Sequence, residues 1–195
     1  MILPDYEPPR AILIEGVECA GKTTLIRELR DGLPWDCKAL SHRAGHQFDR
    51  FIHEYTLGMN VVFNRGHYSE IVYSRLWNRA APFSDAEEAV LNSYVSRHIL
   101  VVLCTANVAT LQARYENRNY RQHASCSELA QICDLFDQAL CAVPHLRYTS
   151  TDDVALAEIV ARIRRQLQTS LPASEEPNSR EKGTIRDATS HTTLL

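Results

Sequence analysis

Short apolar runs alternate along this chain with longer segments in which apolar residues recur every three or four positions. The runs have the length of buried strands, and the longer spacing is that of helices with one buried face. The predicted strands span about residues 10–15, 37–41, 60–64, 99–104 and 145–149. The predicted helices span about residues 25–32, 47–57, 69–79, 85–97, 107–118, 125–141 and 152–169. Because strands alternate with helices, the pattern predicts an α/β fold, in which three layers, α/β/α, enclose a five-stranded parallel sheet.

The junction between the first strand and the first helix carries the pattern G-x-x-x-x-G-K-T, from Gly16 to Thr23. Gly16 and Gly21 allow backbone angles that a Cβ would forbid, so the loop can turn its N–H groups inward beside a helix start. Such a P-loop cradles a polyphosphate, while Lys22 reaches the β- and γ-phosphates and the Thr23 hydroxyl binds Mg²⁺. We expect the Lys22 side chain to face solvent. The expected nucleotide-binding residues here are Gly16, Val17, Glu18, Cys19, Ala20, Gly21, Lys22, Thr23 and Thr24.

The composition is that of an ordinary soluble protein. The net charge is −3 at pH 7, which argues against a surface built as a whole to grip nucleic acid. The six cysteines form no C-x-x-C pair, so we expect reduced thiols in a cytosolic protein. The first ten residues lack a signal-peptide pattern, and no apolar run approaches transmembrane length. We therefore expect a cytoplasmic protein, in the host cytoplasm if it is viral, with no membrane partner.

The composition changes near residue 170, from where Ser, Thr, Pro, Glu and Arg dominate and apolar residues are few. A segment of this kind has too little apolar surface to offset the entropy lost on ordering it. We therefore expect one P-loop domain over residues 1–169 and a disordered tail over residues 170–195.

Arg65 follows the third predicted strand. Ligands of open parallel sheets bind beyond the carboxyl ends of the strands, so Arg65 is expected beside the phosphate cradle. A guanidinium there can clamp an acceptor phosphate through two hydrogen bonds, although pairing with a surface carboxylate remains an alternative. His42 and Arg43, after the second strand, are candidates to line the same acceptor site. His67 fits a structural role at least as well as a functional one.

A second basic group, Arg114, Arg118 and Arg121, spans the end of a predicted helix and the polar segment after it. Spacings of four and three residues place all three on one helical face. In phosphoryl-transfer enzymes, mobile arginines close over the γ-phosphoryl group and neutralise its oxygens, and a solvated helix face is the alternative. Glu18, inside the P-loop, is expected to face the acceptor, where its carboxylate can accept a hydrogen bond from a sugar hydroxyl.

These motifs together resemble the thymidylate kinase family of P-loop nucleotide kinases. The stretch from Ile14 to Leu25 resembles the P-loop of that family. Asn64 to Tyr73 resembles its D-R-x motif and the helix that follows, with Asn64 where Asp is usual, and Arg114 to Arg121 resembles its arginine-bearing LID. The resemblance covers about residues 11–167.

The resemblance implies an ATP-dependent kinase that uses Mg²⁺. Lys22 and Thr23 would then handle the donor phosphates and the metal ion, Glu18 the acceptor sugar and Arg65 the acceptor phosphate. The LID arginines would act on the γ-phosphoryl group. The implied catalytic residues are Lys22, Glu18, Arg65, Arg118 and Arg121, with Arg114 among the nucleotide-binding residues and Thr23 as the metal ligand.

Three interpretations of the acceptor stay open. A deoxynucleoside monophosphate is favoured, because a phosphate acceptor is already an anion and needs no general base, and the ends of strands two and three carry no acid. The alternative is a hydroxyl acceptor, either a free deoxynucleoside or 5-hydroxymethyluracil in DNA, the acceptor of a related phage branch. A non-catalytic nucleotide-binding switch is the third. We expect a nucleotide as partner and DNA only under the alternative, and a homodimer stays open.

Overall fold

The computed structural model describes residues 9–40, 42–43, 47–118 and 124–168, and its elements follow the predicted order. The strands are β1 (Ala11–Gly16), β2 (Asp36–Ala39), β3 (Val61–Asn64), β4 (Ile99–Thr105) and β5 (His145–Thr149). The helices are α1 (Lys22–Arg30), α2 (Phe48–Leu57), α3 (His67–Leu76), α4 (Asp85–His98), α5 (Val108–Glu116), α6 (Leu129–Ala139) and α7 (Asp153–Gln168). A 3₁₀ turn at Cys126–Glu128 leads into α6. The predicted tail, residues 170–195, lies outside the described residues.

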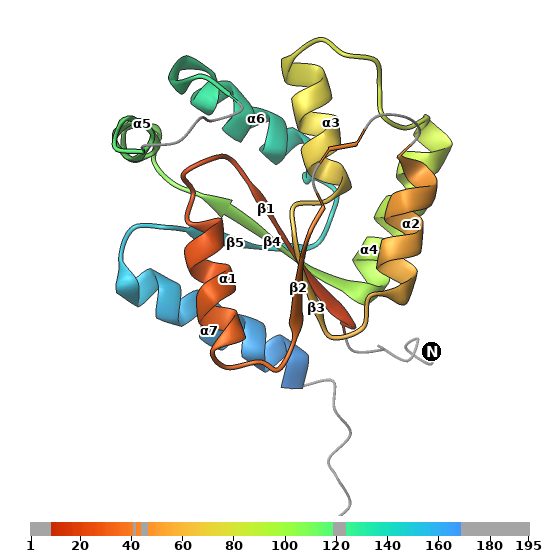
Figure 1. The fold of residues 1–195 in the computed structure, drawn as a ribbon, viewed down its shortest axis with the longest axis horizontal. Helices are drawn as coiled ribbons and strands as arrows, with labels where there is room; N and C mark the ends of the chain where they lie inside the picture. Colours follow the sequence, from red (N-terminus) through yellow and green to blue (C-terminus); the bar gives the residue numbers. More distant parts are fainter. Residues whose placement is uncertain (1–8, 41, 44–46, 119–123, 169–195) are drawn as a thin grey trace, which may run out of the picture.

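The five strands form one parallel sheet in the order β2-β3-β1-β4-β5 (Figure 1). β1 is central and all of its residues are buried, with Leu13 paired to Phe63 on one side and Val101 on the other. The predicted three-layer α/β/α fold around a five-stranded parallel sheet is therefore confirmed. The chain builds the sheet first on one side of β1 and then on the other, so the end of β1 is the switch point at which ligands bind in such sheets.

Helices cover both faces of the sheet (Figure 1). Helices α1 and α7 pack against each other on one face, while α2, α3, α4 and α6 lie on the other. Leu25 of α1 and Ile163 of α7 are fully buried on the first face, and Phe51 of α2 and Tyr68 of α3 are buried on the second. This packing holds the carboxyl ends of β1 and β3 in place, and the functional side chains emerge there.

Helix α3 begins at His67, earlier than the sequence predicts, and a buried carboxylate explains the difference. The backbone N–H groups of Gly66 and Ser69 both donate to Glu15 Oε1, over 2.8 and 3.1 Å. Helix amides of the first turn have no partner within the helix and need one from elsewhere. Here the end of β1 supplies it, and no local capping motif signals such a tertiary contact.

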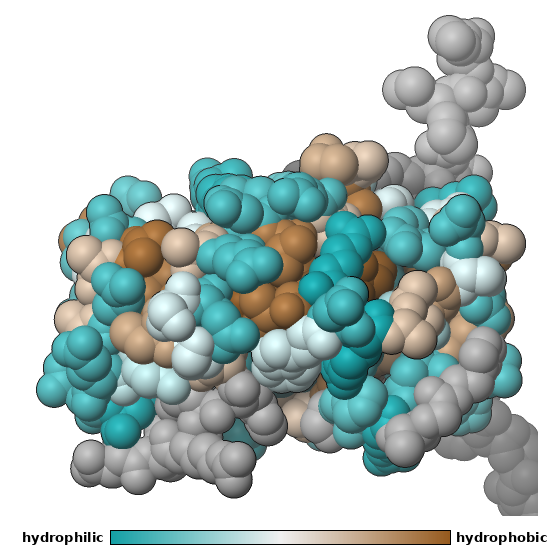
Figure 2. All heavy atoms as spheres, turned by 90° about the horizontal axis from the view of Figure 1, so that it is seen from above, coloured by the Kyte–Doolittle hydropathy of each residue, from teal (hydrophilic) through white to brown (hydrophobic). Residues whose placement is uncertain are grey.

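The face shown in Figure 2 is largely hydrophilic, with apolar side chains visible in patches between polar ones. Among the described residues the large apolar side chains that are exposed are scattered ones: Leu57, Met59, Trp77, Val90 and Val154. All six cysteines lie in the described part of the chain and are free. No helix in that part is both long and apolar enough to cross a membrane.

Candidate active site

The P-loop connects β1 to α1 through an unusual backbone path. Gly16, Cys19 and Gly21 all have positive φ, at 132°, 66° and 84°. A Cβ at Gly16 would collide with the backbone oxygen of Cys104 on β4, so this position requires glycine. Gly21 is the N-cap of α1 and has no side chain that could occupy the first amides of the helix. Those amides, together with the positive end of the helix dipole, form an anion site.

Lys22 does not face solvent, which corrects the prediction from the sequence. Its side chain is buried. Its Nζ donates to the backbone oxygens of Gly16 (2.7 Å) and Val17 (2.6 Å), so the Lys22 side chain folds back onto the P-loop. Burial is the main reason why the pKa of Lys22 falls to about 7, and the nearby Arg65 charge acts in the same direction. Spacing places Lys22 in the loop, but the burial depends on the sheet packed behind it.

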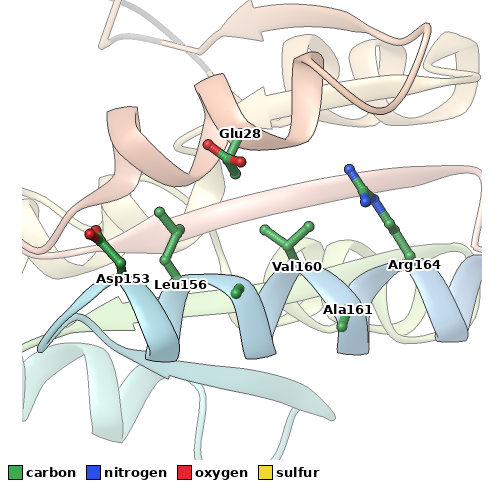
Figure 3. Close-up of a pocket in the computed structure, with 7 residues that line it drawn as sticks. Glu28, Asp153, Leu156, Val160, Ala161 and Arg164 are labelled. Carbon is green, nitrogen blue, oxygen red and sulfur yellow. The ribbon is translucent and has the colours of Figure 1, made fainter.

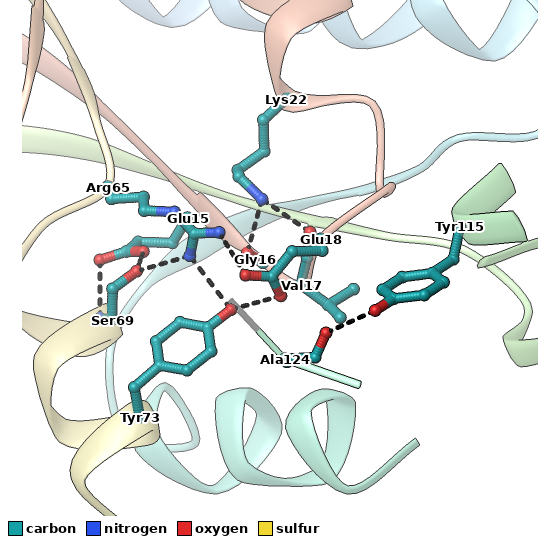
Figure 4. A network of polar contacts seen from close by, with 10 residues as sticks. All are labelled: Glu15, Gly16, Val17, Glu18, Lys22, Arg65, Ser69, Tyr73, Tyr115 and Ala124. Atoms are coloured by element: carbon teal, nitrogen blue, oxygen red, sulfur yellow. Dashed lines mark hydrogen bonds and ion pairs between the residues drawn. The ribbon is translucent and has the colours of Figure 1, made fainter. Parts of the chain in front are cut away.

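Arg65 and Glu18 form the centre of a polar network beside the P-loop (Figure 4). Arg65 Nη2 donates to Glu18 Oε1 over 3.1 Å, and the Tyr73 hydroxyl donates to Glu18 Oε2 over 2.5 Å. Arg65 Nη1 reaches Ser69 Oγ and the Tyr73 oxygen, each over 3.3 Å, and the guanidinium lies 5.2 Å from the centre of the Tyr73 ring. The alternative role considered for Arg65, pairing with a surface carboxylate, is not what the structure has: the carboxylate that Arg65 contacts belongs to the P-loop.

This network sets the charge of Glu18. Burial raises the pKa of the Glu18 carboxyl, but the Arg65 guanidinium and the Tyr73 hydroxyl outweigh it and hold the pKa below its ordinary value. Glu18 is therefore a carboxylate at neutral pH. A general base works best with a pKa near the working pH, so Glu18 in this state is a weak base.

Glu15 fixes the turn that carries Arg65. Besides accepting the two amides at the start of α3, its Oε2 accepts the Ser69 hydroxyl over 2.5 Å, and its side chain is fully buried. Burial raises the pKa of Glu15, against the effect of these hydrogen bonds. Arg65 itself has φ of 68°, which is unusual for a residue with a side chain and marks stored strain. With this backbone conformation, the Arg65 side chain turns back toward Glu18 of the P-loop.

A cavity of about 520 Å³ opens beside this network, within the size range of small-molecule sites. Its wall combines the ends of β2 and β3, the P-loop and one face of α3. The lining residues that bear on the argument are Glu18, His42, Arg65, Glu70, Tyr73 and Trp77. His42 lies in it as expected, whereas Arg43 does not line it. His67 is buried and hydrogen-bonded to Tyr55 and Asn92 on the other side of α3, so its role is structural, and burial lowers its pKa to about 4.

Arg114 joins three segments on the opposite side of the P-loop. Its Nη1 donates to the backbone oxygen of Cys19 (3.1 Å) and to Ser150 Oγ (2.6 Å), and its Nη2 donates to the Ser150 backbone oxygen (3.0 Å). Arg114 and Arg118 do not lie on one helix, because α5 ends at Glu116. Arg118 lies beyond that end, and Arg121 lies outside the described residues.

A second cavity, of about 460 Å³, lies beside Arg114. Cys19, Gly21 and Thr24 of the P-loop region line it together with Arg118 and the segment that connects β5 to α7. The P-loop thus separates two cavities, each with an arginine. Thr23 is exposed at the start of α1. Mg²⁺ prefers a few protein oxygens supplemented by substrate phosphates and water, and the Thr23 hydroxyl fits such a set. No cluster of three His, Cys, Asp or Glu residues that could hold a metal occurs in the described ranges.

A third cavity, of about 340 Å³, lies between α1 and α7 (Figure 3). Glu28 of α1 faces Asp153, Leu156, Val160 and Arg164 of α7 across it. Its lining contains no P-loop residue, although it shares Asp153 and Leu156 with the second cavity.

Tyr73 and Ser150 were not singled out as site residues from the sequence, and Glu70 was considered only as a less plausible general base than Glu18. Tyr73 could have been found, because Arg65, Ser69 and Tyr73 are spaced four apart, and Arg65 contacts both of the others. Ser150 could not, since only the folded sheet brings the end of β5 to Arg114.

Neither a protein-family model nor a curated protein sequence matches this chain. Among solved structures, the YorR protein from Bacillus subtilis, in complex with phosphorylated GDP, is similar, with a TM-score of 0.68 at 18% identity; 81% of this chain and 98% of that chain are covered. Deoxyadenosine kinase from M. mycoides gives a TM-score of 0.52 at 12% identity, with 80% and 98% covered. Thymidylate kinase from Candida albicans gives 0.50 at 13%, with 83% and 92% covered. The chain therefore shares the fold of P-loop kinases of nucleotides and nucleosides.

Proposed function

We propose that this protein is an ATP-dependent kinase that transfers the γ-phosphoryl group to a deoxynucleoside monophosphate. The observation that carries the proposal is the P-loop between two cavities. Cys19 lines the cavity that Arg114 and Arg118 also line, and Glu18 lines the cavity of Arg65. A kinase needs this arrangement, because donor and acceptor must approach in line from opposite sides of the transferred group.

The donor side takes the triphosphate. The P-loop amides and Lys22 bind its phosphates, and Thr23 contributes a hydroxyl to the accompanying Mg²⁺, whose charge offsets that of the phosphates. Arg114 already holds the loop at Cys19. Arg118 is within reach of the loop, because its charge acts on Cys19 and lowers the pKa of that thiol against the effect of burial. Arg121 is the third arginine of the proposed LID.

The acceptor side takes the monophosphate. Arg65 is the cation nearest to the P-loop in this cavity, and a phosphate there would exchange one of its present contacts for a charge-assisted one. Glu18 is then released to accept a sugar hydroxyl. Both acids that line the cavity are engaged, Glu18 with Arg65 and Glu70 with His42, which supports an acceptor that needs no general base. Thymidylate is the monophosphate that the family resemblance suggests.

A hydroxyl acceptor is the second candidate, and one observation favours it. Glu18 lies at the junction of the P-loop and the acceptor cavity, where a base for a hydroxyl group would have to be. A deoxynucleoside or 5-hydroxymethyluracil in DNA would then be the acceptor. The lowered pKa of Glu18 weighs against it, because a carboxylate held as an ion pair takes up a proton poorly.

The experiment offers ATP and Mg²⁺ with each of the four deoxynucleoside monophosphates, with thymidine and with DNA that contains 5-hydroxymethyluracil. We expect ADP and labelled product with one or more monophosphates. Product on DNA or thymidine alone would overturn the proposal and make Glu18 the candidate base. Binding of ATP without turnover of any acceptor would leave only a nucleotide-binding protein.

Arg65→Ala tests the acceptor site directly. Because Arg65 would both bind and align the acceptor phosphate, its loss should raise KM for the acceptor and lower kcat, with kcat/KM reduced by about 10- to 100-fold. Steady-state kinetics with varied acceptor measure this. Arg75→Ala, on the exposed side of α3, is the matched control and should leave both constants unchanged. An unchanged acceptor KM in Arg65→Ala would contradict the assignment.

A further inference from the structure

The acceptor cavity ends at a buried carboxylate that the proposed transfer does not use. Glu70 lies on α3, its side chain is 6% exposed, and its Oε2 is 2.7 Å from Nδ1 of His42, which is itself 57% exposed. Both residues line the cavity. From this juxtaposition we propose that Glu70 and His42 read the base of the acceptor nucleotide and select guanine; the inference rests on the proposed function.

The cavity runs in the direction in which a bound nucleotide would extend. Its lining passes from Glu18 after β1, through Asn64 and Arg65 after β3, to Leu40 and His42 after β2. The strands lie in the order β1, β3, β2, and neighbouring strands are about 4.8 Å apart. Arg65 follows β3 and His42 follows the neighbouring β2, so the cavity continues from the proposed phosphate position toward the outer edge of the sheet. With phosphate at Arg65, the base lies at the His42 end.

One side of the cavity is aromatic. Tyr73 and Trp77 stand with their ring centres 5.1 Å apart, and Arg79 lies 5.1 Å from the Trp77 ring centre. All three line the cavity, and Trp77 is 38% exposed there. A planar base can stack on such a wall, and a purine covers more of it than a pyrimidine.

The Glu70 carboxylate determines which base the cavity prefers. An ionised Glu only accepts hydrogen bonds, so it needs N–H donors from its ligand. Guanine offers two adjacent donors, N1–H and the 2-amino group, which match the two oxygens of a carboxylate. Adenine and cytosine offer one amino group beside a ring nitrogen lone pair. Thymine offers one N–H between two carbonyl oxygens, and both oxygens would face the negative charge.

Glu70 has hydrogen-bond acceptor positions beyond its present contact. His42 contacts one of its oxygens, and the Arg50 guanidinium is near enough for Glu70 to raise the pKa of Arg50 against the lowering effect of burial. Each carboxylate oxygen has two lone pairs, so the His42 contact leaves room for a base. Removing the charge but not the shape of Glu70 should therefore change the order of base preference rather than the fold.

The test compares the four deoxynucleoside monophosphates in the wild-type protein and in Glu70→Gln, by kcat/KM and by equilibrium binding of each monophosphate without ATP. We expect the wild type to prefer deoxyguanosine monophosphate over thymidine monophosphate by about tenfold or more. Glu70→Gln, which presents an amide donor in place of one oxygen, should shrink this ratio by about tenfold. The matched control is Glu54→Gln, on α2 outside the cavity, which should keep the wild-type ratio.

The outcomes separate this inference from the proposed function. A wild type that phosphorylates all monophosphates equally, or thymidine monophosphate best, would overturn the base assignment while leaving the kinase intact. A ratio unchanged in Glu70→Gln would do the same, since the preference would then come from other groups. Failure of every monophosphate as ligand and as acceptor would end both proposals.

Discussion

The state of Lys22 illustrates how single residues in this protein depart from their sequence motif. The motif supplies a lysine for phosphates, but the folded P-loop buries it against two carbonyl oxygens, and its pKa falls to about 7. A phosphate group beside Nζ favours the charged form and raises that pKa again. Nucleotide binding is therefore linked to proton uptake by this one side chain.

At pH 8 we expect ATP binding to take up a substantial fraction of one proton, because Lys22 is then mostly neutral in the free protein and charged in the complex. Calorimetric titrations in two buffers of different ionisation enthalpy measure the uptake. Lys22→Met, which keeps the stem without the charge, should abolish the uptake and weaken binding. A wild-type binding enthalpy that is independent of buffer at pH 8 would contradict the linkage.

The sequence predicts residues whose role is local and misses those whose role is tertiary. Gly16, Gly21 and Lys22 are found because the P-loop is one contiguous segment, and Arg65 because it follows a strand end. Glu15 was not predicted to hold α3, since its partners lie more than fifty positions away along the chain. The burial of Lys22 was missed as well, although its two carbonyl partners lie within the P-loop itself.

At the scale of elements, the boundary of α5 matters most for function. The helix ends at Glu116, where Asn117 closes it by donating its side-chain amide to the Ala113 backbone oxygen over 2.8 Å. Arg114 is therefore fixed on the helix, while Arg118 lies after it. The two arginines stand in different positions: Arg114 holds the P-loop at Cys19, and Arg118 lines the second cavity from beyond the end of the helix.

Arg118→Ala should lower kcat by about a hundredfold and change ATP affinity little, because its charge is needed where negative charge develops in the transition state. Turnover at saturating substrates and equilibrium ATP binding measure the two effects separately. Arg162→Ala, exposed on α7, is the matched control. A loss of ATP affinity with kcat retained would show that Arg118 only binds the ground-state nucleotide.

Strand positions are easier to predict than helix ends in this chain. The bounds of β5 match the prediction, since its alternating buried and exposed residues lie between turn residues. Helix ends depend on caps, and the start of α3 is capped by Glu15 from another element. The helix predicted from residue 125 begins instead as a 3₁₀ turn, where the Ser125 N–H and hydroxyl both donate to Glu128.

At the scale of the whole molecule, the alternation of strands and helices was enough to predict the parallel sheet. The order of the strands was not predicted, because the sequence shows which segments are strands but not which edge each one joins. That order places β3 and β4 on either side of β1, and it thereby sets which loops surround the P-loop.

The domain boundary gives a prediction at the same scale. A chain that ends at residue 170 should keep its melting temperature within about 2 °C and keep its kinase activity, because residues 171–195 contain few apolar side chains to bury. Thermal unfolding and the kinase assay on both lengths of chain test it. A melting temperature lower by many degrees would show that the last residues pack on the domain.

The Glu15 carboxylate has a mechanical consequence. By holding the Gly66 and Ser69 amides from the end of β1, it joins the loop of Lys22 and the loop of Arg65 into one stiff unit. The distance between the two proposed substrates is then fixed by this hydrogen-bonded part of the protein, and it does not depend on the order in which the substrates bind.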